Sequence, residues 1–390
     1  MLYFLCILCI FYYTVRKERK MLMKSVINTQ LYIKQNYLTD ELFTEDSIFF
    51  DIETTGFSPT TSYVYLIGCL YRDGQNLIIH QFFAEHKSDE KDILLQFMDL
   101  LGRFKTIITF NGIGFDIPFI KAKCDTYSIE EHFKEYQYLD IFKLVGNIKF
   151  LLKQANYKQK TIESFLGIHR DDMFSGGELI NVYEDYVHTH SAEAEKLLLL
   201  HNYEDVTGML DLLPILTYNQ ILNGAYLITS VEVAPYTNYE GESCQEVIIS
   251  LQNDYVVPKR VSYQQDDFYF TMNKETTKVR ILIYEGELKY FYPNYKDYFY
   301  LPKEDLAIHK SVASFVDKQY RERAKASNCY TRKAGYFLPQ CDIIMQPFFK
   351  KDYKDKFTYF ELTEDFISSD IMLRRYVEHI FENALHRKKK

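Results

Sequence analysis

One short segment, residues 47–56, restricts the possible folds and functions of this chain more than any other. An apolar run leads into Asp51 and Glu53, which are separated only by Ile52, and a Thr-Thr-Gly turn follows. Alternate residues of a β-strand point to the same face, so the two carboxylates would lie side by side while Ile52 faces the core. Two negative charges this close repel each other unless a cation or a proton neutralises one. Because Mg²⁺ and Mn²⁺ prefer carboxylate oxygens, the segment predicts either a divalent-metal site or a strand end with two solvated acids.

Two later segments supply further carboxylates. An apolar strand ends at Asn111, and Asp116 then enters a predicted helix. An anion at a helix N-terminus is stabilised by about 0.3–1 kcal/mol, so Asp116 is either a metal ligand or a capping residue. His201 and Asp205 are four residues apart on a long predicted helix and therefore share one of its faces. They form either a solvated pair or a site in which Asp205 binds a metal and His201 handles water.

In order and local context, these segments resemble the DEDD superfamily of ribonuclease H-like 3′–5′ exonucleases. Residues 51–56 match the first motif of that family, residues 111–116 match the second, and Asp205 matches the Asp of the third. The Ser-Gly-Gly-Glu helix start at residues 175–178 and the Asn-x-x-Asp-Val string further resemble the YprB-type branch of bacterial ribonuclease H-like proteins. The resemblance covers residues 47–222.

The third motif departs from the family pattern. The branch with this spacing has Tyr four residues before the Asp, and this chain has His201 there. The other branch has His five residues before the Asp, at the position that Leu200 occupies here. His201 is thus the residue of one branch at the spacing of the other, and a histidine can serve as a general base near neutral pH.

The resemblance implies a two-metal nuclease that cleaves DNA or RNA at single-stranded 3′ ends and uses no small-molecule cofactor. The expected ligands of two Mg²⁺ or Mn²⁺ ions are Asp51, Glu53, Asp116 and Asp205. His201 would take or orient the proton of the attacking water. The expected substrate contacts are Thr54, Thr55, Gly56, Asn111 and Phe115. Turn chemistry is the alternative role of Asn111, and core packing is the alternative role of Phe115.

The pattern of apolar residues predicts an α/β fold, a mixed ribonuclease H-like sheet flanked by helices, followed by a smaller α+β domain. The predicted strands are 47–52, 63–71, 77–84 and 105–110, and the predicted helices include 87–101, 115–124 and 191–216. Residues 26–46 are expected to be a mostly polar lead-in. The predicted domains are an N-terminal extension over 1–45, the nuclease domain over 46–223 and the C-terminal domain over 224–390.

In the C-terminal half, strands are expected over residues 225–292, and helices over 303–326 and 363–386. Basic and aromatic residues alternate between 309 and 333, and they form either a phosphate-tracking surface or a solvated helix face. The residues 387–390 form a basic tail that is expected to be disordered.

Charge and cysteine content limit the function further. A net charge of −8 excludes a uniformly basic nucleic-acid-binding coat, so nucleic acid must be contacted through local basic patches or a metal. The 34 Tyr and 30 Phe residues provide rings on which bases could stack. The seven cysteines are scattered, which favours reduced thiols and a cytoplasmic location.

The N-terminus allows more than one interpretation. Residues 2–15 are almost wholly apolar and a basic cluster follows, but the run is shorter than the ~20 residues that a spanning helix needs. It is therefore a weak membrane anchor, a disordered appendage or a translation artefact with the true start at Met21 or Met23. Membrane contact is not expected. Two alternative functions stay open: a nucleic-acid-binding module on a weakened nuclease fold, and a membrane-tethered or scaffold protein.

Overall fold

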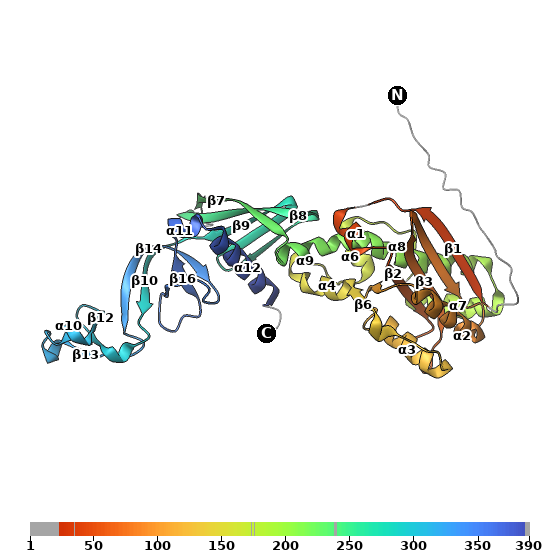
Figure 1. The fold of residues 1–390 in the computed structure, drawn as a ribbon, viewed down its shortest axis with the longest axis horizontal. Helices are drawn as coiled ribbons and strands as arrows, with labels where there is room; N and C mark the ends of the chain where they lie inside the picture. The colour runs from red at the N-terminus through yellow and green to blue at the C-terminus, as the bar shows by residue number, and fades with distance from the viewer. Residues whose placement is uncertain (1–22, 35, 173, 175, 238–239, 387–390) are drawn as a thin grey trace, which may run out of the picture. The chain divides into compact units, whose positions relative to one another are not determined.

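The computed structural model divides into two compact units, which separate in sequence between Asn219 and Gln220, and each is described by itself (Figure 1). The described residues are 23–34, 36–172, 174, 176–237 and 240–386. The apolar start, Ser175 and the basic tail therefore lie outside them. Among the described helices, none combines the length and the apolar character needed to cross a membrane.

The first unit is built on a six-stranded mixed sheet in the order β1-β4-β3-β2-β5-β6. Neighbouring strands among β1 to β4 pair antiparallel, whereas β5 runs parallel to β2 and β6 runs parallel to β5. The strands are β1 (Lys24–Leu31), β2 (Ser47–Thr54), β3 (Val64–Asp73), β4 (Asn76–Phe83), β5 (Thr106–Thr109) and β6 (Gln137–Asp140). This sheet confirms the predicted α/β fold class.

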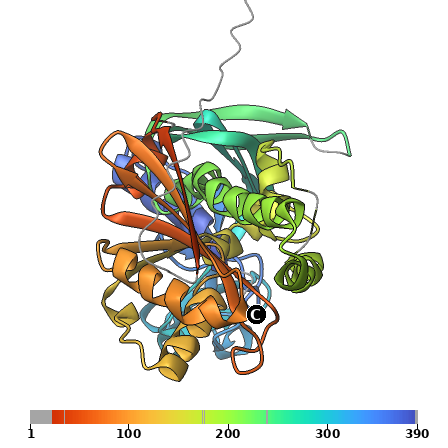
Figure 2. The same cartoon turned by 90° about the vertical axis from the view of Figure 1, so that its right-hand side faces the viewer.

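Helices cover both faces of this sheet (Figure 2). The α-helices of the unit are α1 (Tyr37–Leu42), α2 (Glu90–Leu101), α3 (Asp116–Tyr127), α4 (Ile141–Asn147), α5 (Lys149–Leu152), α6 (Gln159–Leu166), α7 (Gly176–Thr189) and α8 (Ala192–Leu212). The short helix α9 (Thr217–Leu222) includes the point at which the two units divide. A 3₁₀ turn at Leu213–Leu216 follows α8, with Pro214 in its first positions.

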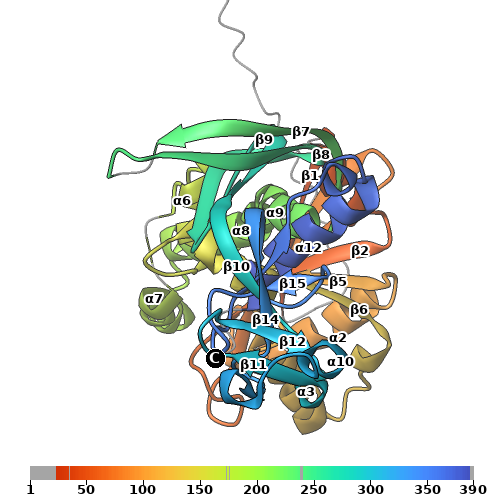
Figure 3. The ribbon, with the colours of Figure 1, turned by 90° about the vertical axis from the view of Figure 1, so that its left-hand side faces the viewer.

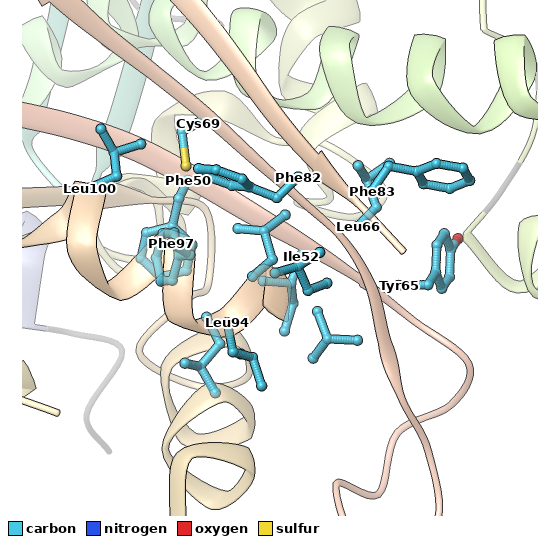
Figure 4. Packing of buried hydrophobic residues seen from close by; sticks show 14 of the residues in the cluster. Phe50, Ile52, Tyr65, Leu66, Cys69, Phe82, Phe83, Leu94, Phe97 and Leu100 are labelled. Carbon is cyan, nitrogen blue, oxygen red and sulfur yellow. The ribbon is translucent and has the colours of Figure 1, made fainter. Parts of the chain in front are cut away.

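The alternation of side chains along β2 separates the core from the polar side of the sheet. Phe50 and Ile52 belong to the buried apolar cluster, in which the ring of Phe50 lies 5.0 Å from that of Phe97 on α2 (Figure 4). Asp51 and Glu53 point the other way, toward α8. The strand pattern therefore places both carboxylates under a single helix.

Three elements of the first unit were not predicted. Strand β1 and helix α1 fall in the expected polar lead-in, and β6 precedes a region that was expected to be helical. Strand β1 is an edge strand in which Val26 is buried while Ile27 is half exposed, so it lacks a continuous apolar run. Strand β6 has only four residues, which is too short for its periodicity to be recognised.

The second unit contains the predicted α+β arrangement, with three separate sheets and a C-terminal helix (Figure 3). One sheet is formed by β7 (Tyr226–Thr237), β8 (Ser243–Gln265) and β9 (Phe268–Leu282). Another is formed by β10 (Tyr284–Phe291), β14 (Tyr330–Gln340), β16 (Thr358–Glu361) and β15 (Phe348–Phe349). The third is formed by β12 (Leu306–His309), β11 (Tyr298–Leu301) and β13 (Glu322–Arg323). The α-helices are α10 (Lys310–Ala313), α11 (Glu364–Ile367) and α12 (Asp370–His386).

The predicted helix over residues 303–326 is wrong. This segment contains β12, the single-turn helix α10 and β13, and it begins with a tight turn between β11 and β12 in which Asp305 has a left-handed φ of 50°. The hydroxyls of Tyr300 and Tyr330 both donate to the Asp305 carboxylate at 2.5 Å, which fixes the turn. Tertiary hydrogen bonds have here overridden the helical spacing of the apolar residues.

The basic-aromatic residues between 309 and 333 are therefore not on one helix face. Several of their cations are paired with acids: Lys310 with Asp297 at 2.8 Å, Arg332 with Glu287 at 2.9 Å and Lys333 with Glu361 at 2.6 Å. Because these cations are paired, less positive charge is available to bind a nucleic-acid backbone than the sequence suggests.

A buried ion pair between α2 and α3 should stabilise the first unit. Lys123 lies 3.1 Å from Glu90, and their side chains are 7% and 0% exposed. Lys123→Met should lower the free energy of unfolding by about 3–5 kcal/mol, because it leaves a buried carboxylate without its cation. Urea unfolding followed by circular dichroism measures this change. Lys121→Met is the matched control, because its pair with Glu131 is more exposed and should contribute under about 1 kcal/mol. Equal losses in the two variants would contradict the prediction.

Candidate active site

The five predicted catalytic and metal-binding residues lie together on the α8 side of the sheet. The Nε2 atom of His201 is 3.4 Å from Glu53 Oε1 and 3.2 Å from Asp205 Oδ2. Asp116, the first residue of α3, accepts a hydrogen bond from the Ile52 backbone N–H at 3.2 Å, which holds it against β2. Asp51 interacts electrostatically with the other three carboxylates. Segments 150 residues apart in sequence thus meet at one site.

The pKa values of three of these carboxylates are raised. Burial is the main cause for Asp51 and Glu53, and repulsion by the neighbouring carboxylates adds to it. Burial also raises the pKa of Asp116 to about 7, although the Ile52 N–H opposes this, and Asp140 and Asp205 raise it further. The cluster is therefore costly to ionise without a compensating cation.

The donor set fits a hard divalent cation. Glu53, His201 and Asp205 each offer a ligand atom, and these three atoms lie within 4.8 Å of one another. Asp51 and Asp116 add carboxylate oxygens beside them. Carboxylate oxygens are the ligands that Mg²⁺ and Mn²⁺ prefer, and an imidazole nitrogen is compatible with Mn²⁺.

The ring of His201 is oriented by an aspartate that was not predicted. Asp172, in the loop between α6 and α7, lies 2.5 Å from His201 Nδ1 through its Oδ2 atom. Lys160 also donates to this Oδ2 at 2.8 Å. Burial alone would raise the pKa of Asp172, but the hydrogen bonds from Lys160, the Phe174 N–H and His201 lower it overall. An ionised Asp172 holds the proton of the imidazole on Nδ1 and leaves Nε2 facing the carboxylates.

The same loop supplies a cation to Asp205. Arg170 Nη1 lies 2.5 Å from Asp205 Oδ1, and the rest of its guanidinium forms a two-pronged ion pair with Glu163 on α6. The side chains of Arg170 and Glu163 are 8% and 1% exposed. Bidentate arginine–carboxylate pairs fix geometry as well as charge. Arg170 therefore sets the orientation of Asp205 and leaves its Oδ2 for His201 or a cation.

The loop is itself anchored to α8. Glu204, next to Asp205, accepts hydrogen bonds from the backbone N–H groups of Asp171 and Asp172, both at 2.9 Å. Sequence reasoning missed Arg170 and Asp172 because neither lies in a recognised motif. In the sequence they are only an Arg and an Asp two residues apart in a polar loop. Their roles follow from the contacts of that loop with α8, which the sequence does not reveal.

Asp51 is oriented by a chain of amides. Asn202 Nδ2 donates to Asp51 Oδ2 at 3.3 Å, and Gln81 Nε2 donates to Asn202 Oδ1 at 3.1 Å. Asn202 packs directly against Gly68 on β3, where an added Cβ would lie 2.0 Å from Asn202 Oδ1. A larger residue at position 68 would therefore displace the Asn202 side chain and disturb its hydrogen bonds to Asp51 and Gln81.

Asp140 holds the turn before Asp116. Its carboxylate accepts the backbone N–H groups of Asn111 and Ile113, both at 3.1 Å, and also the N–H of Lys143 at the start of α4. Asp140 is thus both the helix N-cap and a support of the second motif. Asn111 has a left-handed φ of 68°, which suits its role as a turn residue.

The predicted substrate-contact residues at the end of β2 have local partners. The Thr54 hydroxyl donates to the Gly56 carbonyl at 2.8 Å, and the Thr55 hydroxyl accepts from the Tyr63 N–H at 2.9 Å. A Cβ at Gly56 would lie 2.6 Å from the Ser62 hydroxyl. These contacts give the turn a defined shape.

An exposed aromatic ring lies beside the second motif. Phe115 is half-buried and packs against the core, as its alternative role required, but its ring also lies 6.2 Å from that of Phe57. Phe57 is 88% exposed. Sequence reasoning missed Phe57, although it directly follows the first motif.

A comparison with protein-family models agrees with this fold. Residues 48–217, less than half of the chain, match the family model of the RNase H superfamily. A search of curated proteins finds no match. Similar solved structures include E. coli exonuclease I with a dT13 oligonucleotide, which is 11% identical over 53% of this chain and 55% of that chain, with a TM-score of 0.30. Another is the same enzyme with a 5cy-dA13 oligonucleotide, 10% identical over 53% and 54%, with a TM-score of 0.30.

The chain thus spans about half of the length of these structures. The family match and the order of the mixed sheet together give the first unit a ribonuclease H-like fold, as predicted, and support a nuclease.

The raised pKa of Asp116 predicts a loss of stability with rising pH in the metal-free protein. Because the folded carboxyl keeps its proton up to about pH 7, the folded state binds more protons than the unfolded state above about pH 4. The free energy of unfolding of the wild type minus that of Asp116→Asn should therefore fall by up to about 4 kcal/mol between pH 4 and 7. Urea titrations at several pH values measure this difference.

The exposed acid Asp125, on the same helix, provides the control for this titration. Wild type and Asp125→Asn should differ by a constant amount over the same pH range. A wild-type stability that rises relative to Asp116→Asn would contradict the prediction.

Proposed function

We propose that the chain is a metal-dependent exonuclease that hydrolyses phosphodiester bonds at single-stranded 3′ ends of DNA or RNA, related to the YprB-type branch of the DEDD superfamily. The observation that supports this most is the convergence of Asp51, Glu53, Asp116, Asp205 and His201 on one side of the sheet. Four neighbouring carboxylates, of which Glu53 and Asp116 are buried and Asp51 and Asp205 half-buried, are disfavoured unless cations or protons neutralise them.

Asp51, Glu53, Asp116 and Asp205 would hold two Mg²⁺ or Mn²⁺ ions. When bound, such ions activate water and neutralise the charge that develops on the phosphate. Asp205 would contribute Oδ2, because Oδ1 is paired with Arg170. No small-molecule cofactor is part of the proposal, and the expected location is cytoplasmic.

His201 would accept the proton of the attacking water at Nε2. Its hydrogen bond to Asp172 keeps the other ring nitrogen protonated, so that the lone pair of Nε2 faces the carboxylates. Asp172 acts through His201 and is a positioning residue. The turn at Thr54, Thr55 and Gly56 and the adjacent Asn111 and Phe115 would contact the terminal nucleotide.

Asp51→Ala should abolish metal-dependent shortening of labelled single strands. Removal of a residue that only supports a metal ligand lowers activity about 10–100-fold. The loss in Asp51→Ala should be larger, because Asp51 is itself a proposed metal ligand. Purified protein is incubated with labelled DNA and RNA strands in Mn²⁺, and product lengths are resolved on gels. Asp73→Ala, an exposed acid at the end of β3, should keep full activity. Shortening by the Asp51→Ala variant at the wild-type rate would contradict the proposal.

Asp172→Asn should lower kcat by about 10–100-fold and leave KM nearly unchanged, because it misorients His201 without touching the substrate. The double variant with His201→Ala should be no slower than His201→Ala alone, because the two residues act as one unit. Asp171→Asn, the exposed neighbour, serves as control. Independent, multiplicative losses in the double variant would show that Asp172 does not act through His201.

A nucleic-acid-binding module with weakened catalysis is the second candidate. The pairing of Arg170 with Asp205 favours it, because the arginine already neutralises part of the charge that a metal would neutralise. Salt-sensitive strand binding without cleavage, in Mg²⁺ and in Mn²⁺, would support this candidate against the enzyme. The scaffold alternative rests on the net charge of −8 and on residues 2–15, which lie outside the described part of the chain.

A further inference from the structure

The sheet of β7, β8 and β9 in the second unit is sharply bent. Lys274, in the middle of β9, has a left-handed φ of 49°, and the pairing of β8 with β9 shifts register twice opposite this point. The two halves of β9, residues 268–273 and 276–282, therefore run at an angle and enclose a groove.

The bend is held by buried polar contacts. Asn253 Nδ2 donates to the Lys274 carbonyl at 3.1 Å, and the Thr277 hydroxyl donates to Asn253 Oδ1 at 2.7 Å. Asn253 and Thr277 are both buried. A buried polar network whose members are all hydrogen-bonded favours a single geometry. The shape of the groove is therefore fixed by the fold.

One face of β9 is covered and the other lines the groove. The rings of Phe268 and Phe270 on the covered face pack against Tyr376 and Phe381 of α12. The opposite face, together with Arg260 of β8, encloses about 400 Å³. The lining residues are Arg260, Tyr269, Thr271, Asn273, Thr276, Lys278 and Arg280.

This lining contains three cations and no carboxylate, in a chain whose net charge is −8. Arg280 is partly neutralised by Glu246 at 3.3 Å. Within the described residues, Arg260 and Lys278 have no carboxylate oxygen within ion-pair distance, and both are exposed. An adjoining depression shares Tyr269 and Arg280 with the groove, and its lining also includes Glu246, Asp266 and Asp267, so the cationic surface is limited to the groove.

We propose that this groove binds the phosphate backbone of a single-stranded nucleic acid. Arginine, lysine, hydroxyl and amide groups are the side chains that contact phosphate oxygens, and all of them are present here. Tyr269 adds a half-buried ring, held by a hydrogen bond from the Thr271 hydroxyl at 3.0 Å, on which a base can stack. The inference deepens the proposed function, because it adds a second contact for the same class of substrate.

The test compares the full-length wild type with Arg260→Ala/Lys278→Ala, using fluorescence anisotropy of a labelled dT oligonucleotide. The assays contain EDTA, so binding is measured without cleavage. Each phosphate contact on a single strand contributes about 0.7 to the slope of log K against log salt. The double variant should therefore bind at least about tenfold more weakly at low salt, and its slope should be smaller by about 1.4.

Lys354→Ala/Lys356→Ala is the matched control. It removes the same charge from an exposed loop of the same unit, and neither lysine lines the groove. Circular dichroism checks that both variants fold. Tyr269→Leu should weaken binding without changing the salt slope, because it removes stacking and no charge.

Equal affinities and slopes for the groove variant, the control and the wild type would overturn the proposal. The same holds if inorganic phosphate at millimolar concentration displaces the strand completely, because the site would then be one for small anions. The outcome is independent of catalysis: loss of binding in the groove variant of a protein that does not cleave would support the groove while rejecting the exonuclease.

Discussion

The first unit holds several carboxylates close together at a largely buried site. Alternation along β2 turns Asp51 and Glu53 toward α8, and the start of α3 adds Asp116. Each of these carboxyls has a raised pKa, chiefly because it is buried. A fold that retains such an unfavourable cluster stores free energy that a divalent cation can release on binding. The surrounding elements can be understood as the framework that keeps the charges in place.

That framework is made of paired polar groups from distant parts of the sequence. The α6–α7 loop brings Arg170 to Asp205 and Asp172 to His201, and the loop is tied back to α8. Each catalytic candidate on α8 is therefore fixed by a partner that does not belong to any motif. The loop residues form hydrogen bonds and ion pairs with one side of each motif residue, so the other side of that residue can face a ligand.

Sequence reasoning recovered what is encoded locally. The carboxylates of β2 follow from alternation, and His201 with Asp205 follows from helical spacing. The loop partners could not be predicted, because their contacts depend on where a polar loop lands in three dimensions. The helix expected over residues 303–326 was wrong for a related reason: Asp305 closes a turn through hydroxyls that are distant from it along the chain or across a strand pair.

The contact between Gly68 and Asn202 has a consequence for how this site can diversify. The side chain of Asn202 occupies the space that a Cβ at position 68 would need. The position of the Asn202 side chain, and with it the hydrogen bond that orients Asp51, therefore depends on a residue that carries no functional group. Substitution at such a position alters catalytic geometry while every motif residue remains intact.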